Sequence, residues 1–153
     1  MIELKTLKLE KIDYYNKEHL EFLKELMKSQ DISYLWDLSD SSLDNNQNTN
    51  NYLVLNEEFQ KVGYLNFSNP TEAFYGKTVS LYYAIIESFR GKSYGKRTIE
   101  ETSEWLFSEE EIDCIVAQVD VDNVHSIKTV TKAGMDLVNT SEEYQTFIQR
   151  KNR

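Results

Sequence analysis

The chain has 153 residues, and its 26 acidic and 17 basic side chains give a formal net charge of −9 at pH 7. This length fits a single domain over residues 1–153, because a chain of this size buries about 68–70% of its unfolded surface in one core. The 40% apolar and 28% charged content excludes a largely disordered, collagen-like or coiled-coil protein, and the acidic balance argues against nucleic acid as the main partner.

The amino-terminal part predicts a strand followed by helices. Apolar residues alternate over 2–9, which predicts a strand with a break near its middle. Apolar residues at three- and four-residue steps predict a helix over 12–27, with Asp13 as its N-cap. His19 lies on the apolar stripe of this helix, where we expect a packed structural role. A short apolar segment over 32–38 predicts a second helix.

A hairpin is predicted in the middle of the chain. It follows a polar, Asn-rich segment over 39–51, which we expect to be an exposed loop within the domain. Strands over 52–55 and 62–67 form the hairpin. The Asn-Pro pair at 69–70 and Gly76 then predict a turn before the next strand.

The carboxyl-terminal half predicts a strand, a helix, a strand, a helix and a closing hairpin. Their ranges are 78–86, 94–107, 112–121, 123–133, and 136–140 with 144–150. Asp122 is expected to cap the second helix and Gly134 to end it. The first two strands would lie parallel, joined by the first helix as a crossover. The fold class is therefore α/β, with a mixed, mostly antiparallel sheet flanked by helices.

Basic residues gather between the strand 78–86 and the helix that follows it. Four of the 17 basic residues fall within eight positions that hold no acid; they are Arg90, Lys92, Lys96 and Arg97. A helix start offers unpaired N–H groups and a partial positive charge, and Ser93 and Gly95 are small enough to let a phosphate approach them. The segment predicts a pyrophosphate site on an acidic protein, and an ordinary turn with solvated charges is the alternative.

Two segments resemble signatures of the GNAT superfamily of N-acetyltransferases. Residues 83–96 resemble motif A, whose core is Gln/Arg-x-x-Gly-x-Gly/Ala, and the matching positions are Arg90, Gly91, Lys92, Tyr94 and Gly95. Residues 123–135 resemble the second signature, Asn-x-x-Ser followed by a helix ending in Lys-x-Gly-Phe, and they match it at Asn123, Ser126, Lys132 and Gly134. Both signatures occur in the family's order, and the order of predicted elements agrees across essentially the whole chain.

Four positions depart from the family pattern. Ser93 stands where the first motif A glycine is usual, Glu87 where a proline is often found, and Met135 where an aromatic residue is usual. Val130 occupies the position where many members carry a tyrosine that protonates the leaving thiolate. This last substitution is common in the branch resembling ribosomal-protein N-terminal acetyltransferases, so the chain is most similar to that branch.

The resemblance implies a GNAT-like fold, in which the central parallel strands splay apart to admit acetyl-CoA as co-substrate. It implies direct transfer of the acetyl group to a primary amine in a ternary complex. Loop amides would hold the pyrophosphate, and the strand end and the second signature would hold the pantetheine. The cofactor-binding positions are Ile85, Ile86, Arg90, Gly91, Lys92, Ser93, Tyr94, Gly95, Lys96, Asn123 and Ser126.

Proton transfer needs its own residues, because a primary amine with a pKa of about 10.4 arrives charged at neutral pH. Glu87 at the strand end is the first candidate for accepting that proton, and Asp120 is the second. Either carboxylate could instead only attract a cationic acceptor. Ser126 or water is the candidate for protonating the thiolate, and Tyr144 would reach it only if the final hairpin folded over the site.

Other sequence features bear on nucleophilic and metal chemistry, on membrane contact and on localisation. Cys114 with His125 could suggest a nucleophilic pair, but Cys114 begins an apolar strand where an inert thiol is expected, and no residue spacing predicts a metal site. No apolar stretch approaches the roughly 20 residues of a spanning helix, and residues 1–13 have no apolar core before a small-residue cleavage site, so they are not expected to be a signal peptide. We therefore expect a cytoplasmic protein that contacts neither membrane nor nucleic acid. Because GNAT proteins frequently form dimers, the resemblance also implies a possible homodimer.

Two alternatives to an enzyme stay open. A CoA-binding regulatory or interaction module would keep the basic loop and lack transferase activity, and Ser93 and Val130 favour it. A partner-binding domain without any nucleotide is the other alternative. For the enzyme, an acidic chain suits a cationic acceptor such as a polyamine, an aminoglycoside or the α-amino end of a basic protein.

Overall fold

The computed structural model describes residues 1–29 and 49–151. Its helices are α1 (Lys17–Ser29), α2 (Tyr94–Glu109) and α3 (Val124–Lys132), and a 3₁₀ turn spans Glu87–Phe89. The strands are β1 (Ile2–Glu3), β2 (Lys8–Lys11), β3 (Thr49–Leu55), β4 (Lys61–Ser68), β5 (Thr71–Ala73), β6 (Gly76–Ile85), β7 (Cys114–Asp120), β8 (Asp136–Thr140) and β9 (Tyr144–Arg150). No helix in the described ranges is long and apolar enough to cross a membrane.

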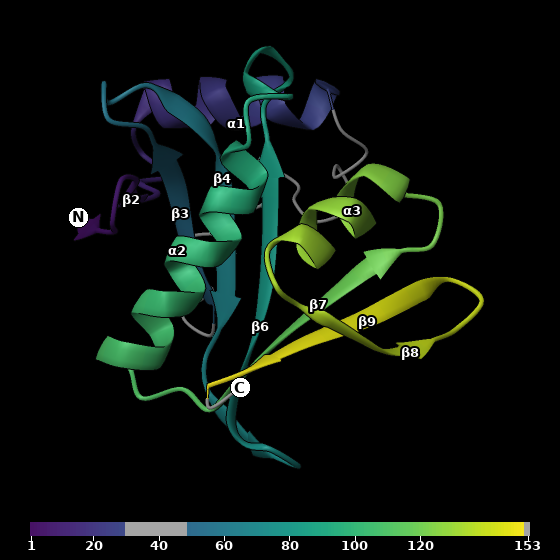
Figure 1. The fold of residues 1–153 in the computed structure, drawn as a ribbon. Coiled ribbons are helices and arrows are strands. Elements are labelled where there is room, and N and C mark those ends of the chain that lie inside the picture. Colours follow the sequence, from purple (N-terminus) through teal and green to yellow (C-terminus); the bar gives the residue numbers. More distant parts are fainter. Residues whose placement is uncertain (30–48, 152–153) are drawn as a thin grey trace.

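The strands form one mixed sheet in the order β1-β2-β3-β4-β6-β7-β9-β8, with β5 paired to β6 (Figure 1). Every pairing among the described strands is antiparallel except that of β6 with β7. This confirms the predicted α/β class and the predicted central parallel pair.

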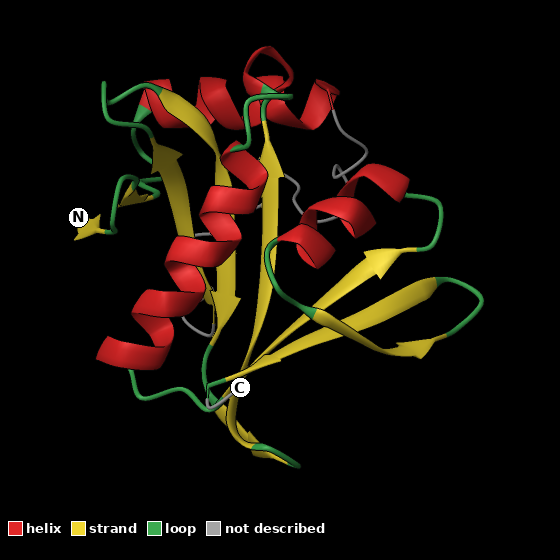
Figure 2. Ribbon diagram, in the orientation of Figure 1, coloured by secondary structure: helices red, strands yellow, loops and turns green. Residues whose placement is uncertain are grey.

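The parallel pair is short, and its two strands then separate. Only Thr78–Ser80 of β6 pairs with Cys114–Val116 of β7. Beyond Ser80, β6 follows β4, whereas β7 follows β9 along its whole length. Figure 2 shows the two arrows diverging from their common base. The sheet therefore has an opening in its hydrogen-bond ladder, as the family resemblance implied.

Side-chain alternation divides the core between the two faces of the sheet. On one face, α2 and α3 supply Ile99, Leu106 and Val130 to a large apolar cluster. On the other face, α1 packs Phe22, Leu23 and Leu26 against β3, β4 and the end of β6. The helices α2 and α3 therefore flank the opening from the same side, as Figure 1 shows.

The start of the chain differs from its sequence-based prediction. Instead of one strand over 2–9, β1 and β2 form a tight antiparallel pair in which Ile2 faces Leu9. The helix begins at Lys17 rather than near residue 12, because Asn16 caps it: the Asn16 Oδ1 atom accepts the N–H groups of Glu18 and His19. The expected N-cap, Asp13, instead closes a local turn by accepting the Tyr15 N–H. His19 is buried, as expected.

The middle of the chain contains two more differences. β3 begins at Thr49, within the segment predicted to be a loop, because Asn51 can be buried there: its Oδ1 accepts hydrogen bonds from Tyr64 and Asn66. The short β5 lies where only a turn was expected. The predicted helix over 32–38 and most of the predicted loop lie outside the described residues. From β4 onward, the other predicted ends are within two residues of the observed ones.

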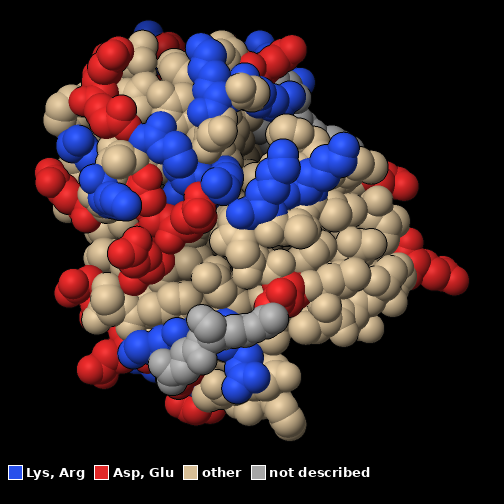
Figure 3. All heavy atoms as spheres, viewed as in Figure 1, with Lys and Arg blue, Asp and Glu red and all other residues tan. Residues whose placement is uncertain are grey.

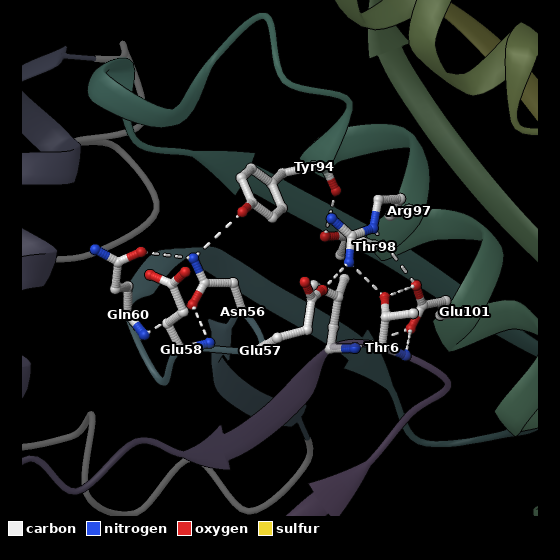
Figure 4. Close-up of polar contacts among 10 residues, drawn as sticks. Thr6, Asn56, Glu57, Glu58, Gln60, Tyr94, Arg97, Thr98 and Glu101 are labelled. Carbon is white, nitrogen blue, oxygen red and sulfur yellow. Dashed lines mark hydrogen bonds and ion pairs between the residues drawn. The ribbon is translucent and has the colours of Figure 1, made fainter.

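A buried carboxylate fastens the β1–β2 turn to α2 (Figure 4). Glu101 is 8% exposed, and its oxygens accept the backbone N–H groups of Thr6 at 2.6 Å and Leu7 at 3.0 Å, together with the Thr6 hydroxyl. Arg97, one turn earlier, contacts both Glu101 and Glu57. Burial opposes the charge of Arg97, but the hydrogen bond and charge of Glu57 and the charge of Glu101 hold the pKa of Arg97 above its ordinary value.

We predict that Glu101→Ala lowers the free energy of unfolding by about 2–4 kcal/mol, because it leaves buried backbone donors unpaired and removes the partner of Arg97. Urea unfolding measures this change. The matched control is Glu104→Ala, an exposed position on the same helix, which should change stability by less than about 0.5 kcal/mol. Equal effects of the two substitutions would contradict a stabilising role for the buried carboxylate.

Candidate functional site

The loop between β6 and α2 passes through two left-handed backbone positions. After the 3₁₀ turn, Gly91 has φ of 76° and Ser93 has φ of 66°. Glycine adopts this conformation freely, whereas serine adopts it with strain. Ser93 therefore has a backbone conformation that glycine, the usual residue of the family signature, adopts more readily.

The amino end of α2 has free donor groups. Ser93 is the N-cap residue, but its side chain caps no N–H group of the described chain, and the first helical turn contains no acid. The first helical hydrogen bond runs from Arg97 N to Ser93 O at 3.0 Å. The N–H groups of Tyr94, Gly95 and Lys96 therefore have no acceptor within the helix, and the positive end of the helix dipole is uncompensated. Such an end binds phosphate groups well.

Positive charge gathers around this helix end. Figure 3 shows lysines and arginines over the start of α2 and along α3, which contributes Lys128 and Lys132. Lys92 lies over the Phe89 ring at 5.4 Å, and Lys96 forms a half-exposed ion pair with Glu100. The Arg90 Nε atom donates to the Ile85 carbonyl at 3.1 Å, which folds this side chain back onto the strand end. The local field is therefore basic although the whole chain is acidic.

Two predicted cofactor residues use their side-chain positions for packing. Asn56, in the β3–β4 turn, donates a hydrogen bond to the Tyr94 hydroxyl at 3.2 Å (Figure 4). Gly95 has no room for a side chain: an added Cβ would lie 3.2 Å from Tyr83 Cε2 and 3.2 Å from Thr129 Cγ2. Gly95 therefore offers a ligand its backbone groups alone, whereas the Tyr94 side chain is held toward the β3–β4 turn.

The edge of β6 that faces the opening is defined by the ladder with β4. Ile86 N donates to Val62 O at 2.9 Å, and Ile86 O accepts Phe89 N at 2.9 Å. Both backbone groups of Ile86 are therefore paired within the chain, and its contact with pantetheine stays a prediction. Antiparallel pairing alternates from residue to residue, so the backbone groups of Ile85 and Tyr83 point toward the side of β7.

The first turn of α3 faces this edge across the opening. Asn123, not Asp122, is its N-cap, and the Asn123 Oδ1 atom accepts Ser126 N at 3.1 Å. The Asn123 amide nitrogen donates to no described residue. The Ser126 hydroxyl lies 3.3 Å from the Tyr83 hydroxyl. The fold thus brings the second signature to β6, and it places beside Ser126 a residue that sequence reasoning did not name, Tyr83.

The acidic candidates lie apart from Ser126. Glu87 is exposed at the end of β6 and lines a surface cavity of about 450 Å³ with Glu25, Lys28, Ile86 and Ser88. Asp120 is exposed at the end of β7, opposite Tyr144 in the β9 ladder. Within the described residues, the Tyr144 hydroxyl makes no hydrogen bond to Ser126.

Cys114 lies at the closed end of the opening. It pairs with Thr78 at the base of the ladder and is 1% exposed. Burial raises the pKa of the Cys114 thiol. A buried, protonated thiol is a poor nucleophile, which agrees with the inert role expected from the sequence.

We predict that Ser93→Gly raises the free energy of unfolding by about 0.5–1 kcal/mol, because it relieves the left-handed strain and loses no cap. The matched change is Gly91→Ala, which should lower stability by about 1 kcal/mol through backbone strain alone, since no atom lies within 4 Å of the added Cβ. Thermal and urea unfolding compare the variants. A less stable Ser93→Gly protein would show that the serine side chain has a role that this geometry lacks.

Comparison with known proteins identifies the family. The acetyltransferase (GNAT) domain family matches residues 8–136, whereas no curated protein matches the sequence. A spermidine N-acetyltransferase SpeG chimera from Vibrio cholerae and hSSAT has a TM-score of 0.79 at 13% identity, covering 97% of this chain and 100% of that chain.

Two other solved structures share the fold. An acetyltransferase (GNAT family) from Bacillus anthracis has a TM-score of 0.78 at 16% identity, with 99% of each chain covered. The Campylobacter jejuni N-acetyltransferase PseH in complex with acetyl coenzyme A has a TM-score of 0.71 at 17% identity, covering 94% of this chain and 98% of that chain. Because the family match spans most of its length, this chain belongs to the acetyltransferase (GNAT) domain family.

Proposed function

We propose that the protein transfers the acetyl group of acetyl-CoA to the amine of a small cationic acceptor, by direct attack in a ternary complex. The observation that carries this proposal is the opening between β6 and β7 beside the uncapped, basic amino end of α2. A structural neighbour of the same fold, PseH, is described in complex with acetyl coenzyme A. The family match supports acetyl transfer as the reaction.

The residues present fit acetyl-CoA. The backbone N–H groups of Tyr94, Gly95 and Lys96 would receive the pyrophosphate, and Lys92 would add charge. The pantetheine amides would pair with the β6 edge at Tyr83 and at the Ile85 N–H, since the Ile85 carbonyl already accepts Arg90 Nε. The free amide nitrogen of Asn123 would hold the pantetheine from the opposite side. Bound acetyl-CoA supplies an activated acyl carbonyl, and the chain fixes its position.

The acceptor is proposed to enter from the cavity on the α1 side. Glu25 and Glu87 line that cavity, and their carboxylates attract a cation. One neighbour is named a spermidine N-acetyltransferase, which makes a polyamine the first acceptor to test. The resemblance to ribosomal-protein N-terminal acetyltransferases makes a protein α-amino group the second. Glu87 would accept the proton that the amine must lose before attack.

A CoA-binding module without transferase activity is the competing candidate. Val130 is fully buried and offers no hydroxyl, and Ser93 strains the loop. Both candidates bind the cofactor. They differ in whether free CoA thiol appears when acetyl-CoA and an amine are mixed with the protein.

We predict that acetyl-CoA raises the melting temperature, because it binds the native state and adds about 2.7 kcal/mol of stability at a hundredfold excess over its Kd. We also predict thiol release with spermidine and less release with a basic peptide that carries a free α-amino group. An unchanged melting temperature at millimolar acetyl-CoA would refute the cofactor assignment. Binding without thiol release from any amine would favour the non-catalytic module.

Two variants separate proton transfer from attraction of the acceptor. Glu87→Gln should lower kcat by about 10²-fold if Glu87 accepts the amine proton. Glu25→Gln should raise the KM for spermidine and leave kcat unchanged. Equal changes in KM alone for both variants would assign Glu87 only to attraction.

We predict that Asn123→Ser weakens acetyl-CoA binding by about 1–3 kcal/mol while the helix cap is retained, because serine can still accept Ser126 N but lacks the amide donor. Asn123→Ala should weaken binding similarly and also lose about 1 kcal/mol of stability with the cap. Calorimetric titration and urea unfolding measure the two quantities. Unchanged affinity in Asn123→Ser would remove this residue from the cofactor site.

The proposed homodimer stays a prediction that sedimentation can check. One neighbour is described as a dodecameric spermidine N-acetyltransferase. On this chain, β8 forms an edge of the sheet and exposes Leu137 and Val138, so a second copy could cover them.

A further inference from the structure

Tyr83 lies in the part of β6 that has separated from β7. It lies on β6 beyond Ser80, the last residue that pairs with β7. Alternation along β6 turns its side chain to the face covered by α2 and α3, where it packs against the large apolar cluster. Its ring lies beside Gly95, at the start of α2, and beside Thr129 of α3. Gly95 therefore makes room for the Tyr83 ring.

The Tyr83 hydroxyl reaches across the opening to α3. Its oxygen lies 3.3 Å from Ser126 Oγ. Burial raises the pKa of Tyr83, and hydrogen bonds with Ser126 and Thr129 offset part of this rise. The elements packed around it present uncharged groups: Gly95 from α2, Ser126 and Thr129 from α3, and the paired Leu65 of β4. Tyr83 therefore carries its proton at neutral pH.

Three other residues that the sequence analysis considered either have no proton to donate or lie away from the opening. Val130 is fully buried and has no proton to give. The Tyr144 side chain lies on β9, with β7 between it and β6. Cys114 lies at the closed base of the opening. Ser126 and Thr129 also present hydroxyls beside Tyr83, but an aliphatic hydroxyl is a much weaker acid than the Tyr83 phenol.

We propose that the Tyr83 hydroxyl protonates the thiolate that leaves acetyl-CoA, with Ser126 donating a hydrogen bond to the Tyr83 oxygen. This proposal rests on the acetyl-transfer function proposed above and assigns it a catalytic acid on β6. Ser126 and Gly95 act as positioning residues: Ser126 fixes the direction of the hydroxyl, and Gly95 leaves space for the ring.

Acetyl transfer forms one C–N bond and breaks the C–S bond of the thioester. The neutral amine attacks the thioester carbonyl, so a C–N bond forms and the C–S bond breaks with its electron pair on sulfur. The Tyr83 proton moves to that sulfur, which leaves as CoA thiol. The attacking nitrogen loses its extra proton to water, because Glu87 already holds the proton taken before the attack, and solvent returns a proton to the Tyr83 oxygen. Ser126 stabilises the transient phenolate by its hydrogen bond.

The first test compares Tyr83→Phe with Tyr52→Phe. Tyr52 belongs to the same face of the core but stacks on Phe67, far from the opening in the sheet order. With the acceptor that the wild type uses best, Tyr83→Phe should lower kcat about 10²-fold with little change in the KM for acetyl-CoA. Tyr52→Phe should keep kcat within about twofold, and Ser126→Ala should show a smaller loss than Tyr83→Phe. Circular dichroism confirms that each variant is folded.

A second test measures the binding of CoA alone, without acetyl transfer. A phenol that donates to sulfur favours the thiolate form of CoA, so the wild type should bind CoA up to about tenfold more tightly as pH rises through the thiol pKa. This gain should be absent in Tyr83→Phe and absent for desulpho-CoA, which lacks the sulfur. Calorimetric titration between pH 7 and pH 9.5, roughly one unit either side of an ordinary thiol pKa, measures it.

The outcomes separate the two proposals. A wild type that binds CoA with the pH gain but acetylates no amine refutes the transferase function and keeps the contact of Tyr83 with sulfur. A Tyr83→Phe protein with unchanged kcat and an unchanged pH gain overturns the role of Tyr83 and leaves the transferase function standing. Absence of CoA binding by the wild type overturns both.

Discussion

The rest of the structure depends on where the pairing of β6 with β7 ends. Gly63 on β4 lets β6 pair closely with β4 beyond that point, because a Cβ at this position would lie 2.4 Å from Ala84 O. With glycine there, β6 follows β4 and leaves β7 after Ser80. Since α2 starts beyond the tip of β6 and α3 beyond the tip of β7, both helices present their amino ends at the open end of the sheet. The positive ends of the α2 and α3 dipoles therefore both lie beside the opening between β6 and β7.

Local patterns predicted most elements of this fold, and long-range contacts explain the exceptions. The strands β6 and β7 are rich in β-branched and aromatic residues, and a strand, helix, strand order favours a parallel pair. Asp13 and Asn16 are equally good N-cap types, and the choice between them depends on the packing of the helix rather than on either residue. Asn51 lies in a strand because Tyr64 and Asn66 satisfy its side chain from β4, which no local pattern reveals.

In the candidate site too, local sequence patterns predicted some features, and long-range pairing determined the others. The spacing of small and basic residues located the loop before α2, and the second signature located the start of α3. The splay itself was expected only from the family resemblance, since no residue pattern in β6 or β7 predicts it. Which residues face the gap depends on hydrogen-bond alternation: Ile86 is paired to β4, and Tyr83 is directed to the gap. The small size of Gly95 matches a phosphate loop in the sequence, yet its space is taken by the Tyr83 ring.

The opening also resolves a conflict between two charged ligands. The anionic cofactor and the cationic acceptor proposed above need fields of opposite sign, and one surface of a protein carrying −9 cannot provide both at the same place. Here the basic groups lie on the α2 and α3 face, whereas the cavity with Glu25 and Glu87 adjoins α1 on the other face. A continuous sheet would keep the two ligands apart by its full thickness. Because β6 and β7 separate, the thioester proposed for the α2 and α3 face and the amine proposed to enter beside α1 would meet in the opening next to Tyr83.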